Sequence, residues 1–312
     1  MDIFDRKAID PMLIKTKQQP FDSDNYIYEL KIDGIRCIAY LDKDSVSLRN
    51  KRDRELILSV PELSGVNKHV NAKCILDTEL TILKGGSINF HEIQRRILMT
   101  DPFKISLASQ RYPACLVVHD VLYKDGKETI YLPIEKRKEI LKSIVIEETP
   151  QFAMSKYIYK NGIALFNYTT QNNLEGVVAK RLGSTYQMGK RSGDWVKFKN
   201  MLDDDYVLCG YVYNSNDKSS IIIGKYRGDK LVIQGFVSLG VNIRALQKYP
   251  IKYRDKPLFN LKDTKVQWLE PTLVCTIEHM PDKNINFRQP SLKCIRDDKD
   301  PRECQIEEEN GD

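Results

Sequence analysis

Apolar and polar residues alternate over short segments along much of the chain, and this pattern predicts mainly strands. The run from Tyr26 to Tyr40 reads as a strand, a tight turn and a second strand, because apolar residues flank Asp33-Gly34, a dipeptide typical of hairpin turns. Lys31 lies in this otherwise apolar run. The pattern therefore places Lys31 near the corner of a predicted hairpin, where the backbone fixes its position.

The rest of the first 200 residues contains two predicted helices among further strands. Residues 90–98 have the spacing of an amphipathic helix, with apolar side chains on one face. Residues 133–148 begin with a proline that suits the first position of a helix, and they also carry an apolar face. Residues 46–58 read as a strand followed by a basic turn. Alternating or continuous apolar runs predict further strands at residues 74–80, 116–126, 175–181 and 195–199.

The pattern changes after residue 200, and 312 residues are more than one core usually holds. Residues 201–205, Met-Leu-Asp-Asp-Asp, read as a polar hinge between two domains. The acidic stretch at residues 307–312 is expected to be a disordered tail. Between them, short alternating segments predict a small β-barrel, with strands at residues 206–213, 219–226, 230–238 and 272–279.

The composition is that of a soluble globular protein, with 41% apolar and 29% charged residues. The formal charge of +6 leans mildly towards a polyanionic partner. The N-terminal segment lacks the apolar core of a signal peptide and no run reaches the length of a membrane span, which predicts an intracellular protein. The seven cysteines are scattered singly, a pattern that indicates reduced core residues rather than a zinc site or a disulfide framework.

Several predicted strands carry charged residues that could act as a nucleophile, bind a metal ion or bind a phosphate. Lys31 would act as a nucleophile only when neutral, so its pKa would have to be lowered by burial or by nearby cations, a metal ion included. Glu175 precedes a short β-branched run that ends in Lys180, and a strand of this kind can aim a carboxylate at a metal ion and an amine at a phosphate. Lys197 and Lys199 are two residues apart in a strand, so they share a face and can reach one phosphate.

Segments from about residue 11 to residue 300 resemble the superfamily of ATP-dependent DNA ligases, RNA ligases and mRNA capping enzymes. The run Lys31-x-Asp33-Gly34-x-Arg36 resembles the motif that carries its nucleophilic lysine. Residues 175–180, Glu-Gly-Val-Val-Ala-Lys, are closer to bacterial ATP-dependent DNA ligases than to capping enzymes, which tend to have Asp-Gly-Leu-Ile. Taken singly, each segment has an ordinary explanation as well: a surface lysine beside a turn, a solvated loop, or core packing.

The resemblance implies roles for individual residues. In this superfamily the lysine attacks the α-phosphorus of a nucleoside triphosphate and becomes a covalent lysyl-NMP, which here would be Lys31. His119 stands where the family has a phenylalanine or tyrosine that stacks on adenine, and a core histidine is the alternative. Glu79 and Glu175 would position the ribose or a metal ion, Mg²⁺ or Mn²⁺. The implied ATP-binding residues are Glu29, Lys31, Arg36, Glu79, His119, Glu175, Lys180, Lys197, Lys199, Arg296 and Lys299. The implied DNA-binding residues are Arg49, Asn50, Arg95, Lys190 and Arg191.

The resemblance also implies an α+β fold. A nucleotidyltransferase (ATP-grasp-like ligase) domain of antiparallel sheets with helices is expected over residues 1–200, followed by an OB-fold β-barrel over residues 201–312. We expect an ATP-dependent DNA ligase that seals nicks in double-stranded DNA. Few residues precede Lys31, so we expect the minimal bacterial or phage type. The protein is expected to be a monomer in the cytoplasm of a bacterial or phage-infected cell. The alternatives are a capping-type guanylyltransferase, an RNA ligase, and a catalytically idle nucleic-acid-binding module.

Overall fold

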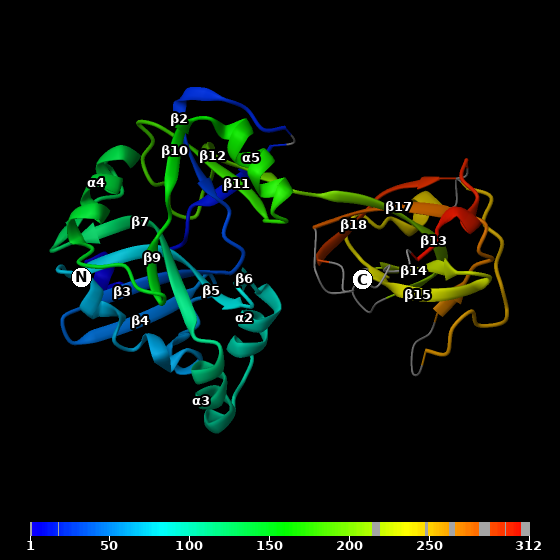
Figure 1. The fold of residues 1–312 in the computed structure, drawn as a ribbon, viewed down its shortest axis with the longest axis horizontal. Coiled ribbons are helices and arrows are strands. Elements are labelled where there is room, and N and C mark those ends of the chain that lie inside the picture. The colour runs from blue at the N-terminus through cyan, green and yellow to red at the C-terminus, as the bar shows by residue number, and fades with distance from the viewer. Residues whose placement is uncertain are drawn as a thin grey trace. The chain divides into compact units, whose positions relative to one another are not determined.

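The structure, a computed structural model, describes residues 2–17, 19–213, 219–246, 249–261, 266–280, 288–296 and 298–306. The chain forms two compact units, Met1–Lys199 and Asn200–Asp312 (Figure 1). The acidic stretch at residues 307–312, expected to be a tail, lies outside the described residues. No helix in the described part of the chain is long and apolar enough to span a membrane.

One sheet of the first unit has five strands in the order β1-β12-β11-β2-β10 (Figure 1). Neighbouring strands are antiparallel, except that β1 runs parallel to β12. The helix α5 (Gly162–Gln171) covers this sheet, and its Leu165 and Phe166 pack against the buried Tyr28, Val177 and Phe198. The strands are β1 (Leu13–Thr16), β2 (Ser23–Leu30), β10 (Tyr157–Lys160), β11 (Gly176–Arg181) and β12 (Arg191–Lys199).

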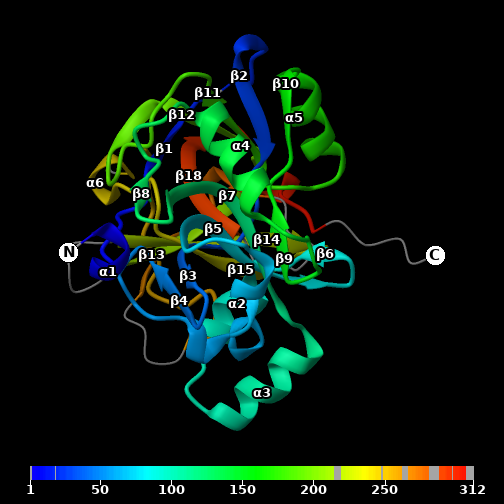
Figure 2. The same cartoon turned by 90° about the vertical axis from the view of Figure 1, so that its left-hand side faces the viewer.

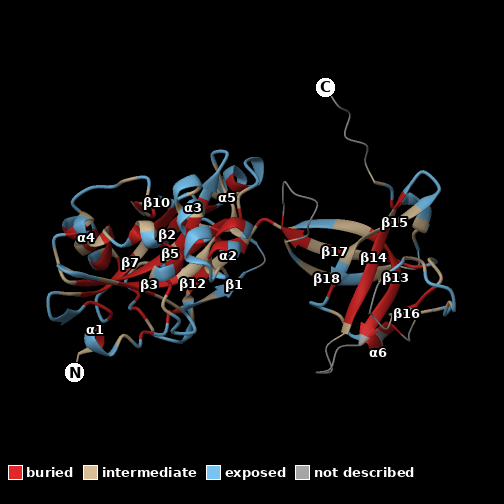
Figure 3. Cartoon of the chain, turned by 90° about the horizontal axis from the view of Figure 1, so that it is seen from below, coloured by how far each residue is buried: buried red, intermediate tan, exposed pale blue. Residues whose placement is uncertain are grey.

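The second sheet of this unit has seven strands, with β4-β3-β5-β7-β8 in order, β6 on β5 and β9 on β7. Alternate residues of β3 enter two different cores: Cys37 and Ala39 lie in one, Ile38 and Tyr40 in the other. Both faces of the strand are therefore covered, which explains its nearly continuous apolar sequence and its buried centre in Figure 3. The strands are β3 (Ile35–Asp42), β4 (Ser45–Asn50), β5 (Cys74–Lys84), β6 (Ser87–Ile88), β7 (Ala114–Lys124), β8 (Lys127–Glu128) and β9 (Phe152–Met154).

Helices surround this second sheet, and α4 packs against β7 (Figure 2). The helices predicted at residues 90–98 and 133–148 are confirmed as α2 (Phe90–Ile97) and α4 (Ile134–Ile144). The side chain of Asn89 caps the first turn of α2, because its oxygen accepts a hydrogen bond from the amide of Glu92. The other helices are α1 (Ile3–Arg6), α3 (Pro102–Arg111) and short 3-10 turns at Ile57–Ser59, Pro61–Leu63 and Val66–His69.

The predicted hairpin around Lys31 is wrong. The strands β2 and β3 do not pair; they lie in different sheets, and residues 31–34 connect one sheet to the other. Gly34 is needed for a different reason from a hairpin turn: a Cβ at this position would lie 2.4 Å from the carbonyl oxygen of Leu80 on β5. The Asp33-Gly34 dipeptide therefore allows a close crossing between sheets, and Lys31 lies at that crossing.

The second unit is built on a sheet with β15-β14-β13-β17-β18 in order and β16 paired to β13. All of these neighbouring strands are antiparallel. Cys275 and Cys209 belong to two different cores in this unit. The strands are β13 (Leu202–Tyr213), β14 (Ser219–Arg227), β15 (Lys230–Val237), β16 (Val266–Trp268), β17 (Val274–Met280) and β18 (Arg288–Arg296), with helices α6 (Ile243–Leu246) and a 3-10 turn at Pro301–Glu303.

All seven cysteines of the chain are free thiols, and all except Cys294 are buried. Burial of six thiols agrees with the predicted core positions, whereas the exposed Cys294 does not. Burial raises the pKa of the Cys37 and Cys275 thiols above the usual range, so these side chains stay protonated and behave as small apolar residues.

The domain boundary predicted at residues 201–205 lies next to the division between Lys199 and Asn200, but the segment is not a polar hinge. Residues 202–205 are the first residues of β13 and pair with β17, with Leu202 opposite His279 and Asp205 opposite Thr276. A run of three aspartates is tolerated in this strand because each carboxylate has a cationic partner: Asp203 pairs with Lys293, Asp204 with Lys225, and Asp205 with Lys299. Those partners lie about 20 to 90 residues further along the chain, so no local pattern reveals them.

Candidate active site

A cavity of about 50 Å³ in the first unit is lined by residues from both of its sheets and from the crossing between them. Its volume is far below that of a typical ligand site, so binding a nucleotide requires side chains to move. The apolar and aromatic part of the cavity wall consists of Ile14, Leu30, Val178 and Trp195. Six residues of the predicted ATP-binding set also line it: Glu29, Lys31, Arg36, Glu79, His119 and Lys180.

Lys31 is held from both its backbone and its side chain. Its amide donates a hydrogen bond of 2.8 Å to the carbonyl oxygen of Gly176, and its Nζ lies 2.8 Å from Oε2 of the buried Glu175. Gly176 has φ +139°, and a Cβ there would lie 2.0 Å from the carbonyl oxygen of Phe198. The glycine therefore allows β11 to pass close to β12, and this contact sets the direction of the Glu175 side chain towards Lys31.

Arg36 forms a bidentate ion pair with Asp77, a fully buried residue of β5. The hydroxyl of Tyr186 donates a third hydrogen bond, of 2.9 Å, to the same carboxylate. Burial raises the pKa of Asp77, but Arg36 outweighs that effect and holds the pKa below its usual range. Neither Asp77 nor Tyr186 was among the site residues predicted from the sequence. The position of Asp77 within the apolar run 74–80 was a signal that could have identified it.

Glu29 is buried and its carboxylate lies between two ammonium groups. Lys138 Nζ is 2.7 Å from Oε1, and Lys180 Nζ is 2.9 Å from Oε1 and 3.0 Å from Oε2. The hydroxyl of Ser155 donates to Oε2 at 2.9 Å. Burial raises the pKa of Glu29, but Lys138 and then Lys180 outweigh burial and hold the pKa well below its usual range. Lys138 was not among the predicted site residues.

Glu79 and His119 face each other across the cavity, with His119 Nε2 3.9 Å from Glu79 Oε2. Burial raises the pKa of Glu79 to about 7 and lowers the pKa of His119 to about 4, so the imidazole is neutral at neutral pH. His119 also approaches Glu29, at 3.6 Å from Nδ1 to Oε2. Whether its ring stacks on a base stays a prediction.

The carboxylate of Glu175 lies close enough to Glu79 to contribute to its raised pKa, and Lys31 lies near both side chains. Among the described residues, no group of three or more His, Cys, Asp and Glu side chains is placed to hold a metal ion. Mg²⁺ characteristically binds through one or two carboxylates together with water and substrate phosphates. The pair Glu79 and Glu175 fits that kind of site and not an all-protein cage.

Lys180 and Lys197 extend the positive charge along β11 and β12. Burial lowers the pKa of Lys180 to about 8, and its Nζ lies 4.3 Å from the centre of the Trp195 ring. Burial, then Lys199 and Lys31, lower the pKa of Lys197 to about 8, so the three lysines are near neighbours. The predicted shared face of Lys197 and Lys199 follows from their positions opposite Val178 and Gly176 on β11.

The predicted DNA-binding residues lie outside this cavity and most are tied to other parts of the unit. Arg49 at the end of β4 pairs with Asp53 at 2.7 Å. The Asn50 side chain accepts hydrogen bonds from two backbone amides of the basic turn that follows it. Arg95 on α2 pairs with Glu92, and Arg191 donates to a backbone carbonyl of β1, next to Lys190. Their contact with DNA stays a prediction.

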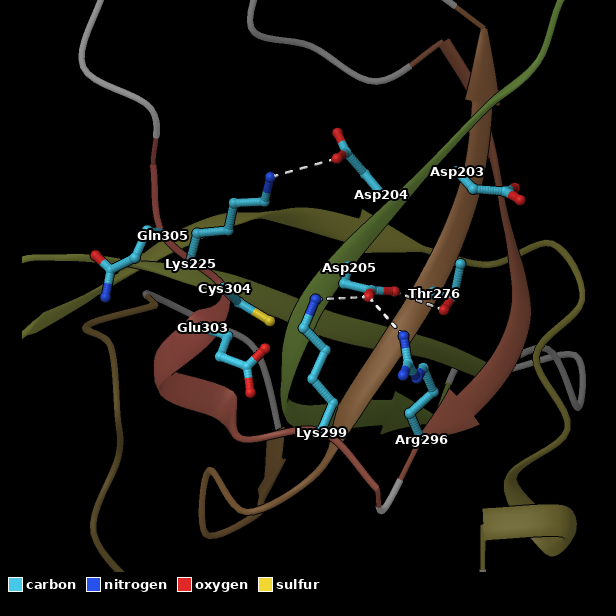
Figure 4. A pocket seen from close by; sticks show the side chains of 10 residues that line it. All are labelled: Asp203, Asp204, Asp205, Lys225, Thr276, Arg296, Lys299, Glu303, Cys304 and Gln305. Carbon is cyan, nitrogen blue, oxygen red and sulfur yellow. Dashed lines mark hydrogen bonds and ion pairs between the residues drawn. The ribbon is translucent and has the colours of Figure 1, made fainter.

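Arg296 and Lys299 belong to the second unit, where they line a pocket of about 490 Å³ (Figure 4). Both donate to Asp205 Oδ2, at 3.1 Å from Arg296 Nη1 and 2.9 Å from Lys299 Nζ. The hydroxyl of Thr276 donates to the other carboxylate oxygen at 2.6 Å. Asp298 binds the remaining edge of the Arg296 guanidinium. Both predicted phosphate-binding cations therefore have carboxylate partners in this structure.

Comparisons with known proteins show which family the chain belongs to. Residues 11–199 match a family model described as the ATP dependent DNA ligase domain. An SPbeta prophage-derived DNA ligase-like protein, LigB, of Bacillus subtilis is 31% identical over 204 residues, which cover 65% of this chain and 72% of LigB. A DNA ligase of Methanothrix thermoacetophila is 27% identical over 310 residues, covering 91% of this chain and 54% of the relative.

A third relative is longer still. The multifunctional non-homologous end joining protein LigD of Pseudomonas aeruginosa is 26% identical over 315 residues, which cover 95% of this chain but 36% of LigD. The chain therefore spans about half, or less, of the last two relatives.

Solved structures share the fold. The ligase domain of Mycobacterium tuberculosis LigD superposes with a TM-score of 0.57 at 21% identity, covering 98% of this chain and 100% of that domain. A Lig E DNA ligase, whose structure is described as DNA binding with a minimal scaffold, superposes with a TM-score of 0.63 at 17% identity, covering 93% of this chain and 100% of that one. Since the family model covers more than half of the sequence, the chain belongs to the ATP-dependent DNA ligase domain family.

Proposed function

We propose that this protein is an ATP-dependent DNA ligase that seals nicks between a 5′-phosphate and a 3′-hydroxyl. The observation that carries the proposal is the setting of Lys31 in the domain matched by the family model. Its amine is held at 2.8 Å by a buried carboxylate, and it lies at a cavity lined by further acids and cations. Catalysis of phosphoryl transfer depends mainly on positioning and on neutralising charge, and this cavity offers both.

In the first step the Lys31 amine attacks the α-phosphorus of ATP. A nitrogen–phosphorus bond forms and the amine releases a proton to solvent, while the bond between the α-phosphorus and the bridging oxygen breaks and pyrophosphate leaves with that oxygen. Glu175 holds the attacking nitrogen through the 2.8 Å contact with its Oε2. Lys180, Lys197 and Lys199 offset the charge that accumulates on the α-phosphate.

Two further transfers complete the reaction. The AMP passes from Lys31 to the 5′-phosphate at a nick, and the 3′-hydroxyl then displaces AMP and forms the phosphodiester bond. Glu79 and Glu175 would hold Mg²⁺ or Mn²⁺, which supplies additional positive charge at the phosphates. The Arg36 guanidinium, fixed by Asp77, contributes a permanent cation at the cavity wall.

The second unit is proposed to be an OB-fold barrel that takes part in the first step. Arg296 and Lys299 would exchange their carboxylate partners for the pyrophosphate leaving group, a need that ends when pyrophosphate departs. The residues proposed to contact the DNA backbone are Arg49, Asn50, Arg95, Lys190 and Arg191. The protein would act as a monomer in the cytoplasm of a bacterial or phage-infected cell, where nicked DNA and ATP are both present.

Labelled nucleotides followed by nicked substrates test this function. The proposal predicts a covalent adduct with ATP and not with GTP, and sealing of a nicked DNA duplex. An adduct with GTP would indicate a capping-type guanylyltransferase instead, and sealing confined to RNA strands would indicate an RNA ligase. Absence of any adduct would favour a nucleic-acid-binding module without catalysis.

A further inference from the structure

Arg296 and Lys299 converge on a single oxygen atom, Oδ2 of Asp205 (Figure 4). The distances to this oxygen are 3.1 Å from Arg296 Nη1 and 2.9 Å from Lys299 Nζ. A guanidinium and an ammonium group that share one oxygen are arranged as they would be around one phosphate oxygen. The Asp205 carboxylate therefore occupies the point at which these two cations would bind a phosphate group.

The Asp205 carboxylate is held by the sheet of the second unit. Asp205 lies opposite Thr276 in the pairing of β13 with β17, and the Thr276 hydroxyl donates to Oδ1 of Asp205 at 2.6 Å. Arg296 is the last residue of β18, and Lys299 follows the end of that strand. Long side chains at a strand end turn away more readily than a short side chain within a paired strand, so an exchange of partners moves the cations and leaves the carboxylate in place.

The charges around this pair of cations are balanced. Arg296 also binds Asp298 through Nε and Nη2, so two cations and two carboxylates form one neutral group. The Asp298 side chain is 66% exposed and that of Asp205 is 18% exposed, so solvent weakens the pair with Asp298 more than the pairs with Asp205. A polyanion that binds Arg296 and Lys299 therefore has to overcome the attraction of Asp205 in particular.

We infer that Asp205 competes with pyrophosphate for Arg296 and Lys299, and so limits how tightly this product is held. The inference rests on the proposed function, in which the two cations bind the leaving group. Pyrophosphate gains the two cations by taking them from Asp205, and the carboxylate binds them again after pyrophosphate departs. Asp205 thus lowers the affinity for pyrophosphate and promotes its release after the first step.

Inhibition of adduct formation by pyrophosphate measures this competition. Asp205→Asn removes the competing charge and keeps a side chain of the same shape. We expect it to lower the inhibition constant of pyrophosphate by about tenfold, because a neutral amide attracts the two cations far less than a carboxylate does.

The reverse reaction should show the same shift. A pyrophosphate oxygen bonds to the α-phosphorus of the lysyl-AMP, the nitrogen–phosphorus bond breaks, and Lys31 regains a proton as ATP forms. In Asp205→Asn this reaction should reach half of its maximal rate at a pyrophosphate concentration about tenfold lower than in the unaltered protein.

Asp203→Asn is the matched control. It removes the same charge from the same strand and from the wall of the same pocket, but the cation that it frees is Lys293. We expect this control to change the inhibition constant by no more than about twofold, because Lys293 is an exposed cation outside the pair that binds Asp205.

Two results would overturn the inference. Weaker inhibition by pyrophosphate in Asp205→Asn would mean that Asp205 holds the cations in place for the ligand instead of competing with it. A change in the inhibition constant of less than about threefold would mean that the carboxylate does not oppose binding. If Asp205→Asn fails to fold, Asp205→Ser is measured in the same way and judged by the same constant.

Calorimetric titration with pyrophosphate alone provides a readout that needs no turnover. The dissociation constant should fall by about tenfold in Asp205→Asn, and Arg296→Ala combined with Asp205→Asn should lose most of that gain because one freed cation is then missing. An unchanged dissociation constant in Asp205→Asn would contradict the competition. If the unaltered protein formed no adduct with ATP but this shift were still seen, the failure would lie with the proposed reaction and not with the competition.

Discussion

Replacing Asp77 by asparagine removes one charge from a buried ion pair and leaves its partner, Arg36, in place. Asp77 is fully buried, whereas the Arg36 side chain is 19% exposed. Breaking a buried pair by removing one partner costs about 3–5 kcal/mol, because the remaining charge stays poorly solvated. Arg36 has some access to water and asparagine keeps one acceptor oxygen, so we expect the lower value, about 3 kcal/mol.

A loss of about 3 kcal/mol in a unit of this size corresponds to a fall in Tm of about 6–12 °C. Thermal unfolding followed by circular dichroism measures it. Tyr186→Phe is the matched control, because it leaves the ion pair intact. It removes the hydrogen bond that the Tyr186 hydroxyl donates to the same carboxylate and the one that it accepts from the buried amide of Met12, and it should cost about 2 kcal/mol. The double variant Asp77→Asn with Arg36→Met should be more stable than Asp77→Asn alone, since the uncompensated charge is then gone.

The pH dependence follows from the direction of the pKa shift. Because the pKa of Asp77 is lowered in the folded protein, its contribution to stability is present above the unfolded pKa of about 3.9 and is lost as the pH falls through the folded value. The difference between the unaltered protein and Asp77→Asn should therefore be complete at pH 7 and shrink below about pH 4. A Tm within about 2 °C of the unaltered protein at pH 7 would refute this reasoning.

Three further predictions concern catalysis and DNA binding. Glu175→Gln should slow adduct formation at least about 100-fold and lower Tm by less than Asp77→Asn does, because Glu175 makes one contact with a flexible lysine whereas Asp77 holds Arg36 through two; an equal or larger loss of stability would indicate a structural role. Lys190→Ala with Arg191→Ala should reduce the salt slope of DNA binding by about two units, and an unchanged slope in a folded double variant would move the DNA contact elsewhere. Arg296→Ala with Lys299→Ala should abolish adduct formation yet still seal a nick supplied in adenylated form, and equal loss of both activities would contradict a role confined to the first step.

Much of the fold could be predicted from the sequence, because period-two and helical patterns are local. The strands now described as β5, β7, β11 and β14 and the helices α2 and α4 all follow from such patterns. The hairpin prediction failed because an Asp-Gly dipeptide can form either a hairpin turn or a close crossing between two sheets. The crossing requires Gly34 because the chain passes close to Leu80 of β5, which lies 46 positions later in the sequence. The hinge prediction failed for a similar reason, since the cations that neutralise residues 203–205 come from distant strands.

The candidate site was predictable only where residues fall in recognisable segments. Six of the predicted residues line one cavity, although nothing in their spacing shows that two sheets meet there. Lys138 could not be found in this way. It lies among the charged residues of an amphipathic helix, where a lysine is usually exposed, and it is buried only because α4 packs against β7. Asp77 is likewise explained by its tertiary partner Arg36.

The covalent role of Lys31 is the central claim, and intact-protein mass spectrometry after incubation with ATP and magnesium tests it most directly. The unaltered protein should gain the mass of one AMP, and peptide mapping should place it on Lys31. Lys31→Ala should gain none, while Lys190→Ala, a matched lysine variant outside the cavity lining, should be modified normally. An AMP adduct of normal yield on Lys31→Ala, carried by any other residue, would contradict the account.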